Sequence, residues 1–202
     1  MTIPERYLAL GDSFTIGTGA TPDRSFPARL ARAWREAGQD VELENPAVNG
    51  YTTDDLILEE LPLVGPFRPT LVTLLIGAND IVQGSREDRY RAQLARIHGA
   101  IRSAAPAARV VALPQPDWSR SPAAAGFGDL AVIARTIERF NAAAREEAER
   151  AGAGWTDLFP LMRQQAEKGM FAPDGLHPSA DAYAEWAQDL ATRLRTGSAS
   201  SP

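Results

Sequence analysis

The sequence predicts an α/β fold in which a parallel β-sheet lies between layers of helices. Five short apolar segments alternate along the chain with longer segments of helical spacing. The third of them, residues 71–76, is apolar at nearly every position, as is typical of a strand covered on both faces. Because strands and helices that alternate in this way form right-handed βαβ units, all the strands are expected to run parallel.

The predicted strands are short, and each is followed by polar residues, glycine or proline. They cover residues 7–10, 41–43, 71–76, 109–113 and 154–158. The first strand leads directly into Gly11-Asp12-Ser13, so a serine hydroxyl follows a buried strand. Open α/β sheets bind their ligands at the carboxyl ends of the strands. We therefore expect the chemistry of this protein to lie at that edge of the sheet.

Between the strands, apolar residues recur at steps of three and four, which is the spacing of amphipathic helices. This spacing predicts helices near residues 26–34, 90–101, 130–140 and 180–194. The last helix is expected to bury Tyr183, Trp186, Ala187 and Leu190.

The segment 115–128 is longer than a connection needs, and it contains Trp118 and Phe127. One interpretation is a mobile loop over the site, in which Trp118 supplies apolar contact to a substrate. The other is a surface loop whose aromatic side chains dock on the body of the protein. The sequence favours neither.

Length and composition indicate one domain, predicted for residues 1–195, with a polar tail at 196–202 that is expected to be disordered. The net charge of -5 and the scattered basic residues argue against a nucleic-acid partner. No apolar segment is long enough to span a membrane, and the start of the chain lacks a signal-peptide pattern. A cytoplasmic location is therefore the default, although a secreted chain whose leader has been removed would look the same.

Three residues that are far apart in the sequence could form a hydrolytic triad. Ser13 is the candidate nucleophile, although such a serine on its own is more often a helix N-cap. His177 is the candidate base because it lies on a Gly/Pro-flanked loop, whereas His98 lies at helical register and is expected to be structural. Asp174 precedes His177 by three residues, a spacing at which a turn can bring the carboxylate to the imidazole. Its alternative role is to cap the turn after Pro173.

Two further residues could donate N–H groups to the oxyanion of a tetrahedral intermediate. Asn79 follows the third strand and offers a side-chain amide, and Gly50, near the end of the second, offers a backbone N–H. Alternatively, each is only a turn residue. Asp12 and Asp80 are expected to bond within their own loops. The chain has no cysteine, and its histidines and carboxylates lack metal-ligand spacing, so we expect neither a metal nor a cofactor.

Taken together, these residues resemble the four sequence blocks of the SGNH hydrolases, the GDSL-type esterase and lipase superfamily. The matching blocks are Gly11-Asp12-Ser13, Gly50, Gly77-Ala78-Asn79-Asp80 and Asp174-Gly175-Leu176-His177. The resemblance implies a flavodoxin-like three-layer α/β/α sandwich with a five-stranded parallel sheet. It also implies that Ser13 is the nucleophile, His177 the base and Asp174 the acid that orients it. The oxyanion hole would consist of the Ser13 and Gly50 backbone N–H groups and the Asn79 side chain.

One departure from the family pattern is Phe14, which stands where the family name has leucine and is expected to affect packing only. The Gly-x-Ser-x-Gly elbow of the α/β-hydrolases is missing, which makes that similar fold the second choice. Residues that flank the motifs are candidates for substrate contact: Tyr51, Trp118 and Phe171, and also Phe14, Ile81 and Leu176.

The expected activity is hydrolysis of a small-molecule carboxylic ester through an acyl-enzyme on Ser13. Short acyl chains are favoured because the chain has little beyond the core fold from which to build a large lid. The alternatives are an acyltransferase that passes the acyl group to a sugar or another alcohol, a lysophospholipase or thioesterase, and a non-catalytic binding domain that keeps the fold.

Overall fold

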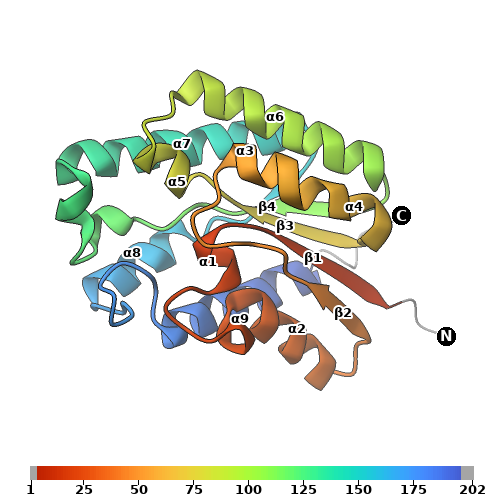
Figure 1. Cartoon of the computed structure of the whole chain (residues 1–202). Helices are drawn as coiled ribbons and strands as arrows, with labels where there is room; N and C mark the ends of the chain where they lie inside the picture. Colours follow the sequence, from red (N-terminus) through yellow and green to blue (C-terminus); the bar gives the residue numbers. More distant parts are fainter. Residues whose placement is uncertain (1–3, 197–202) are drawn as a thin grey trace.

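A five-stranded parallel sheet forms the centre of the molecule (Figure 1). The structure is a computed structural model that describes residues 4–196. Its strands are β1 (Glu5–Gly11), β2 (Val41–Glu44), β3 (Leu71–Leu75), β4 (Arg109–Ala112) and β5 (Gly154–Trp155), in the spatial order β2-β1-β3-β4-β5. The predicted parallel α/β fold is confirmed. The fifth strand is shorter than expected, because the chain turns after Thr156 and the Asp157 side chain accepts the N–H of Phe159 at 3.0 Å.

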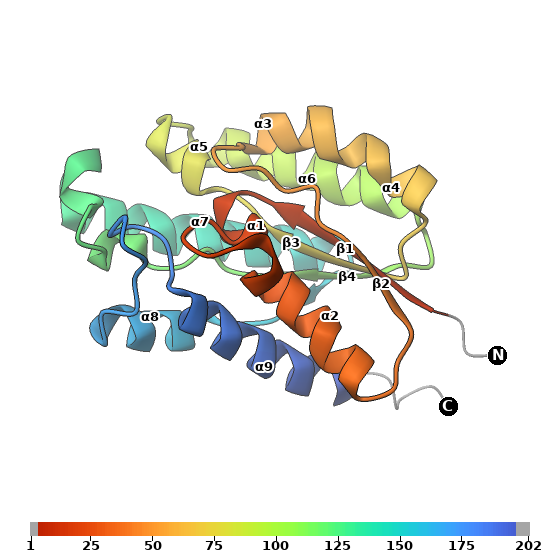
Figure 2. The same cartoon turned by 60° about the horizontal axis from the view of Figure 1, so that its bottom comes forward.

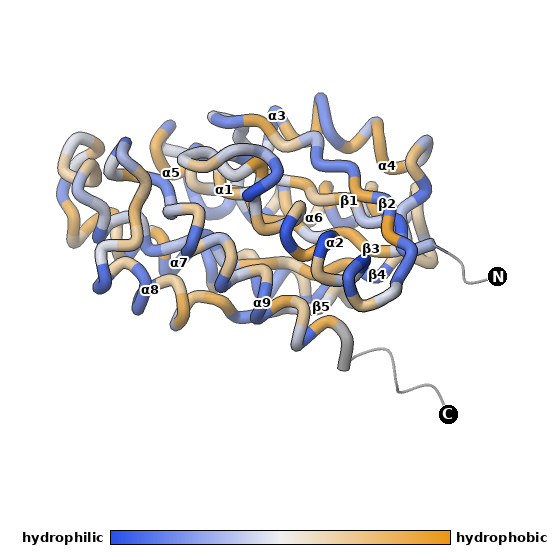
Figure 3. The backbone as a smooth tube through the Cα atoms, turned by 90° about the horizontal axis from the view of Figure 1, so that it is seen from below, coloured by the Kyte–Doolittle hydropathy of each residue, from blue (hydrophilic) through white to orange (hydrophobic). Residues whose placement is uncertain are grey.

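Helices cover both faces of the sheet, so the fold has three layers (Figure 2). One face carries α2 (Phe26–Glu36), α8 (Phe159–Glu167) and α9 (Ala180–Thr196), and the other carries α4 (Leu61–Phe67), α6 (Glu87–Ala104) and α7 (Leu130–Arg150). Alternate residues of β1 supply the two cores: Tyr7 and Ala9 face the first layer, and Leu8 and Leu10 face the second. Every residue of β3 is buried, and this strand has mostly the hydrophobic colour in Figure 3.

The remaining helical segments are short. They are α1 (Ser13–Ile16), α3 (Thr53–Asp55), α5 (Ala78–Val82), a π-helical turn at Leu56–Glu60, and 3₁₀ turns at Pro22–Arg24, Trp118–Arg120 and Ala124–Phe127. Thr196 is the last described residue and belongs to α9, and the rest of the predicted tail lies outside the described residues. Within residues 4–196, none of the helices combines the length and the apolar character needed to cross a membrane.

The order of the strands produces a switch point at which a ligand-binding site can form. From β1 the chain extends the sheet in one direction to β2 and then in the other direction to β3. In open α/β sheets, ligands bind outside the carboxyl ends of the strands at such a switch point. Ser13 follows β1 and Asn79 follows β3, so both lie at this point of the sheet.

Candidate active site

Ser13 is the first residue of α1, but it does not cap that helix. The cap is Asp12, whose Oδ1 accepts the N–H of Phe14 at 3.0 Å. The hydroxyl of Ser13 is therefore not needed to start the helix, and it lines a pocket instead. The chain turns sharply at Gly11, just before Ser13. Only glycine fits there, because a Cβ at Gly11 would collide with the carbonyl oxygen of Leu75 and with the Thr15 side chain.

The turn from Asp174 to His177 brings the carboxylate onto the imidazole. His177 Nδ1 lies 2.7 Å from Asp174 Oδ2, and Asp174 Oδ1 accepts the backbone N–H groups of Leu176 and His177 at 2.9 and 3.0 Å. The carboxylate thus both orients the ring and caps the turn. Gly175 has φ of 68°, which a residue with a side chain rarely adopts.

The electrostatics of this pair favour an ionised acid. Partial burial opposes ionisation of Asp174, but the hydrogen bonds from Leu176 N–H, the His177 ring and His177 N–H outweigh it and lower the pKa of Asp174. A carboxylate at Nδ1 places the ring proton on that nitrogen. Nε2 of His177 is then the nitrogen that can accept a proton.

The Asn79 side chain has one N–H in use and a second to offer. Asn79 lies in α5, and its Nδ2 donates to the carbonyl oxygen of Tyr51 at 2.9 Å. An amide nitrogen carries two hydrogens, so one remains for a ligand. Gly50 lies in the turn just before Tyr51, is exposed and has φ of 92°, the left-handed region that favours glycine.

A second bond joins the same two segments. Asp80 accepts the backbone N–H and the hydroxyl of Thr53 at 3.0 and 2.5 Å. The expectation that Asp80 bonds within its own loop is therefore wrong, whereas Asp12 does bond within its own turn. We call the bonds Asn79–Tyr51 and Asp80–Thr53 the clasp, because together they hold the turn that contains Gly50 against α5.

A pocket of about 100 Å³ brings most of the candidate residues together. It is lined by Ser13, Phe14, Asn49, Ala78, Asn79, Val82, Trp118, Phe127, Leu176 and His177. Among the described residues, the predicted Gly50, Tyr51, Ile81 and Phe171 do not line this pocket, although Asn49 is the neighbour of Gly50. Val82 and Ala78 were missed by the sequence analysis; both flank Asn79 in α5, which is the signal that could have identified them.

Trp118 combines one part of each interpretation of the segment 115–128: it is docked on the body of the protein, and it contacts the pocket. It is buried, and its Nε1 donates to Gln115 Oε1 at 3.2 Å, so it is docked on the body of the protein. It also lines the pocket, with the exposed Phe127 against it at 5.7 Å between ring centroids. Trp118 is therefore a fixed wall of the pocket, with Phe127 at its outer side.

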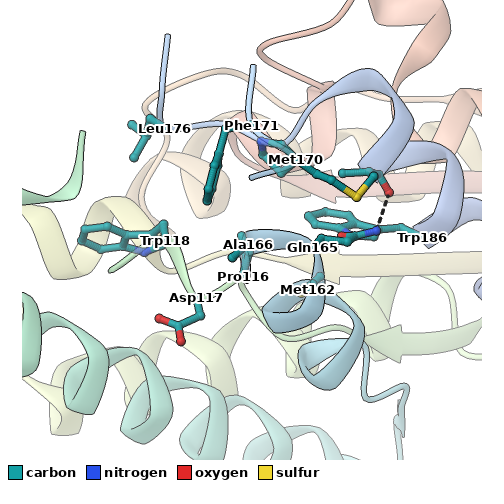
Figure 4. Close-up of a pocket in the computed structure, with 12 residues that line it drawn as sticks. Pro116, Asp117, Trp118, Met162, Gln165, Ala166, Met170, Phe171, Leu176 and Trp186 are labelled. Carbon is teal, nitrogen blue, oxygen red and sulfur yellow. Dashed lines mark hydrogen bonds between the residues drawn. The ribbon is translucent and has the colours of Figure 1, made fainter. Parts of the chain in front are cut away.

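A second, smaller cavity of about 20 Å³ lies behind this wall (Figure 4). Trp118 and Leu176 line both cavities. Figure 4 shows these two side chains at one end of the small cavity, Phe171 in the middle and Trp186 at the other end. Phe171 thus lies deeper than predicted, behind the pocket of Ser13.

The other histidine is remote from the pocket. His98 is buried on α6, where burial, and after it the charge of Arg102, lowers its pKa to about 4. Residues 4–196 contain no group of three or more histidine, aspartate or glutamate side chains placed to hold a metal ion.

Comparison with known proteins bears on the family and the fold of the chain. The sequence model of the GDSL-like lipase/acylhydrolase family matches residues 9–185. An arylesterase from Vibrio mimicus is 36% identical over 80 residues. That segment is 40% of this chain and 40% of the relative, so the match spans less than half of the curated protein.

Solved structures share the fold. TesA has a TM-score of 0.75 at 23% identity, over 94% of this chain and 98% of its own. The esterase EstA from Pseudoalteromonas sp. has a TM-score of 0.77 at 18% identity, over 96% of this chain and 98% of EstA. The lipase/acylhydrolase from Enterococcus faecalis has a TM-score of 0.77 at 19% identity, over 95% of each chain. Since the family model covers most of the sequence, the chain belongs to the GDSL-like lipase/acylhydrolase family.

Proposed function

We propose that the protein is a serine esterase that hydrolyses small carboxylic esters through an acyl-enzyme on Ser13. The observation that supports this most is the common pocket of Ser13, Asn79 and His177, in which Asp174 holds the imidazole from behind. The carbonyl of a bound ester would lie between the serine hydroxyl and the amide donor. The family match and the arylesterase relative support the same reaction class.

The proposed reaction has two halves. His177 Nε2 takes the proton of the Ser13 hydroxyl while Oγ attacks the ester carbonyl, and the N–H groups of Ser13, Gly50 and Asn79 stabilise the oxyanion. As the tetrahedral intermediate collapses, the imidazolium gives this proton to the departing alcohol. Water then attacks the acyl-enzyme, giving one proton to His177, which returns it to Ser13 as the acid leaves.

The size of the pocket favours short acyl chains. Its volume of about 100 Å³ is small beside the roughly 300–1,000 Å³ of sites that take drug-sized ligands. A series of p-nitrophenyl esters of increasing acyl length tests this preference, and it should show its highest kcat/KM at the shortest acyl groups. The same assay with added alcohols distinguishes a hydrolase from an acyltransferase, because an acyltransferase forms the new ester in preference to the free acid.

Replacing Asn79 with alanine should lower kcat by on the order of 10²–10³, or about 2.7–4 kcal/mol, because one oxyanion donor is lost. The Val82→Ala variant is the matched control, since Val82 lines the same pocket but offers no donor. Asn79→Ala also loses the hydrogen bond from Asn79 to Tyr51, which should lower the free energy of unfolding by about 1 kcal/mol. Unchanged kcat in a folded Asn79→Ala protein would remove Asn79 from the oxyanion hole.

Replacing Trp118 with alanine should shift the preference toward longer acyl chains, because the wall between the two cavities is removed. Each additional buried methylene is worth about 0.8 kcal/mol, or roughly fourfold in kcat/KM. Phe127→Ala is the control, since Phe127 lines the outer pocket only. The ester series measures the shift, and circular dichroism verifies folding. An identical chain-length profile for the wild type and a folded Trp118→Ala would show that Trp118 does not limit the acyl group.

A further inference from the structure

Phe14, the residue that follows the candidate nucleophile, packs against the candidate base. The ring centroids of Phe14 and His177 are 5.6 Å apart, and the two planes are inclined at 55°. This separation is typical of interacting aromatic rings. Phe14 also lines the pocket of Ser13, and it stands where the family name has leucine, which has no ring. The sequence analysis expects Phe14 to affect packing only, but its contact with His177 points to a role in the reaction.

The hydrogen bond between His177 and Asp174 leaves the imidazole some freedom. It holds one ring atom, Nδ1, at 2.7 Å from Asp174 Oδ2. The outer torsion of a histidine side chain has a broad range, so a ring held at Nδ1 can still tilt and move its Nε2. The Asp174 side chain is 41% exposed, and water therefore competes for the same bond. A second support on the ring would keep Nε2 in one place.

Phe14 can be that support because it is itself held firmly. Its side chain is buried, and it belongs to the core on the side of the sheet that carries α2, α8 and α9. Its backbone N–H donates to Asp12 Oδ1 at 3.0 Å. Protein cores are packed as densely as organic crystals, so a ring fixed in one cannot move aside easily. The nucleophile and this rigid ring are neighbours on α1.

The main chain of His177 is held by other contacts. Gly19 approaches so closely that a Cβ at Gly19 would lie 3.1 Å from His177 Cβ. The carbonyl oxygen of His177 accepts the N–H of Ala172 at 2.8 Å. The Tyr183 hydroxyl donates to the carbonyl oxygen of Thr18 at 3.0 Å and so holds the segment that contains Gly19. Since these contacts restrain the backbone, the orientation of the ring is what a second support must restrict.

We propose that Phe14 is a positioning residue for the base His177. Its ring keeps the imidazole against Asp174, so that Nε2 stays available to the Ser13 hydroxyl. This role rests on the proposed function, in which His177 takes up and returns a proton in each half of the reaction. A misplacement of about 1 Å can lower a rate on the order of 10²-fold, so a ring that tilts away from Asp174 slows both halves.

The first test uses activity. Phe14→Leu keeps a buried apolar side chain but removes the ring. Its kcat for p-nitrophenyl acetate should fall about five- to tenfold while KM changes less than about twofold, because proton transfer is impaired and substrate binding is retained. Phe26→Leu is the matched control, since Phe26 is buried in the same core and its ring contacts Trp186. It should keep the wild-type kcat, and an equal kcat in a folded Phe14→Leu would overturn the proposal.

The second test follows the imidazole directly and needs no activity. The chain has two histidines, so the ring signals of His177 in an NMR spectrum are those that His177→Gln removes. The Nδ1 proton exchanges with water when the ring leaves Asp174. This exchange should be about threefold or more faster in Phe14→Leu than in the wild type, because the ring opens more often. Phe26→Leu should exchange at the wild-type rate.

The two tests together separate the positioning role from the esterase assignment. If Phe14→Leu does not fold, Phe14→Met makes the same comparison, because methionine fills irregular apolar sites and also lacks a ring. Unchanged exchange of the His177 proton in the folded variant would overturn the proposal, whatever the turnover of the wild type. Faster exchange in a protein that hydrolyses no ester would support Phe14 as the support of the imidazole and contradict only the esterase assignment.

Discussion

Ser13→Ala is expected to abolish measurable turnover, with a fall in kcat on the order of 10⁵–10⁶. The hydroxyl is the group that would carry the acyl chain, and among the described residues that line the pocket only Ser13 has a hydroxyl. The loss should leave the fold intact, because Asp12 caps α1 and the Ser13 side chain is not part of that cap.

Two measurements together check this result. Hydrolysis of p-nitrophenyl acetate gives kcat, and mass spectrometry after treatment with a fluorophosphonate detects a covalent adduct on an activated serine. The Ser103→Ala variant is the control, since Ser103 is an exposed serine on α6. Equal labelling of the wild type and Ser13→Ala, or no labelling of the folded wild type, would contradict the esterase proposal.

Asp174→Asn is expected to lower kcat on the order of 10³–10⁴ with little change in KM. Asparagine can keep the oxygen that accepts the Leu176 and His177 backbone N–H groups, so the turn persists. Its amide presents N–H groups to Nδ1 of His177, which forces the ring proton onto Nε2 and removes the base.

The pH dependence of stability distinguishes a loss of kcat in Asp174→Asn from unfolding of the variant. The pKa of Asp174 is lowered in the folded protein, so its contribution to stability is present at neutral pH and is lost as the pH falls through that pKa. Asp174→Asn should therefore have a flatter acid limb in urea unfolding, while its structure at pH 7 is retained. Asp181→Asn, at an exposed aspartate on α9, should change neither kcat nor the acid limb. Wild-type kcat in Asp174→Asn would exclude Asp174 from orienting the base.

The sheet and its main helices could be predicted from the sequence because burial imposes a pattern on them. Residues 71–76 are apolar throughout, and the strand that they contain is covered on both faces. The segment 53–67 was not predicted as helical, because Pro62, Gly65 and Pro66 interrupt the usual signals and the first part forms a π-helical turn.

The site could be predicted in part, for a related reason. Residues whose chemistry is local, such as Asp174 and His177, reveal their partner through spacing. Residues whose hydrogen-bond partner is remote in the sequence give no such indication. Glu60 bonds Gly11, and no local motif indicates this. The sequence shows only that Glu60 lies at a step of four from both Leu56 and Val64, on the side of the segment that carries these apolar residues.

The clasp separates the parts of the pocket that can vary from the parts that cannot. The proposed oxyanion donors at Gly50 and Asn79 belong to two segments that the bonds Asn79–Tyr51 and Asp80–Thr53 join. The walls at Trp118, Phe127 and Leu176 come from other segments, 115–128 and 171–178, which this pair of bonds does not include. In evolution, replacements of the wall side chains in the segment 115–128 can therefore change which esters fit while the reacting groups keep their arrangement, whereas the segment 171–178 also carries Asp174 and His177. The same division marks the segment 115–128 as the place where a new substrate range can be engineered without rebuilding the chemistry.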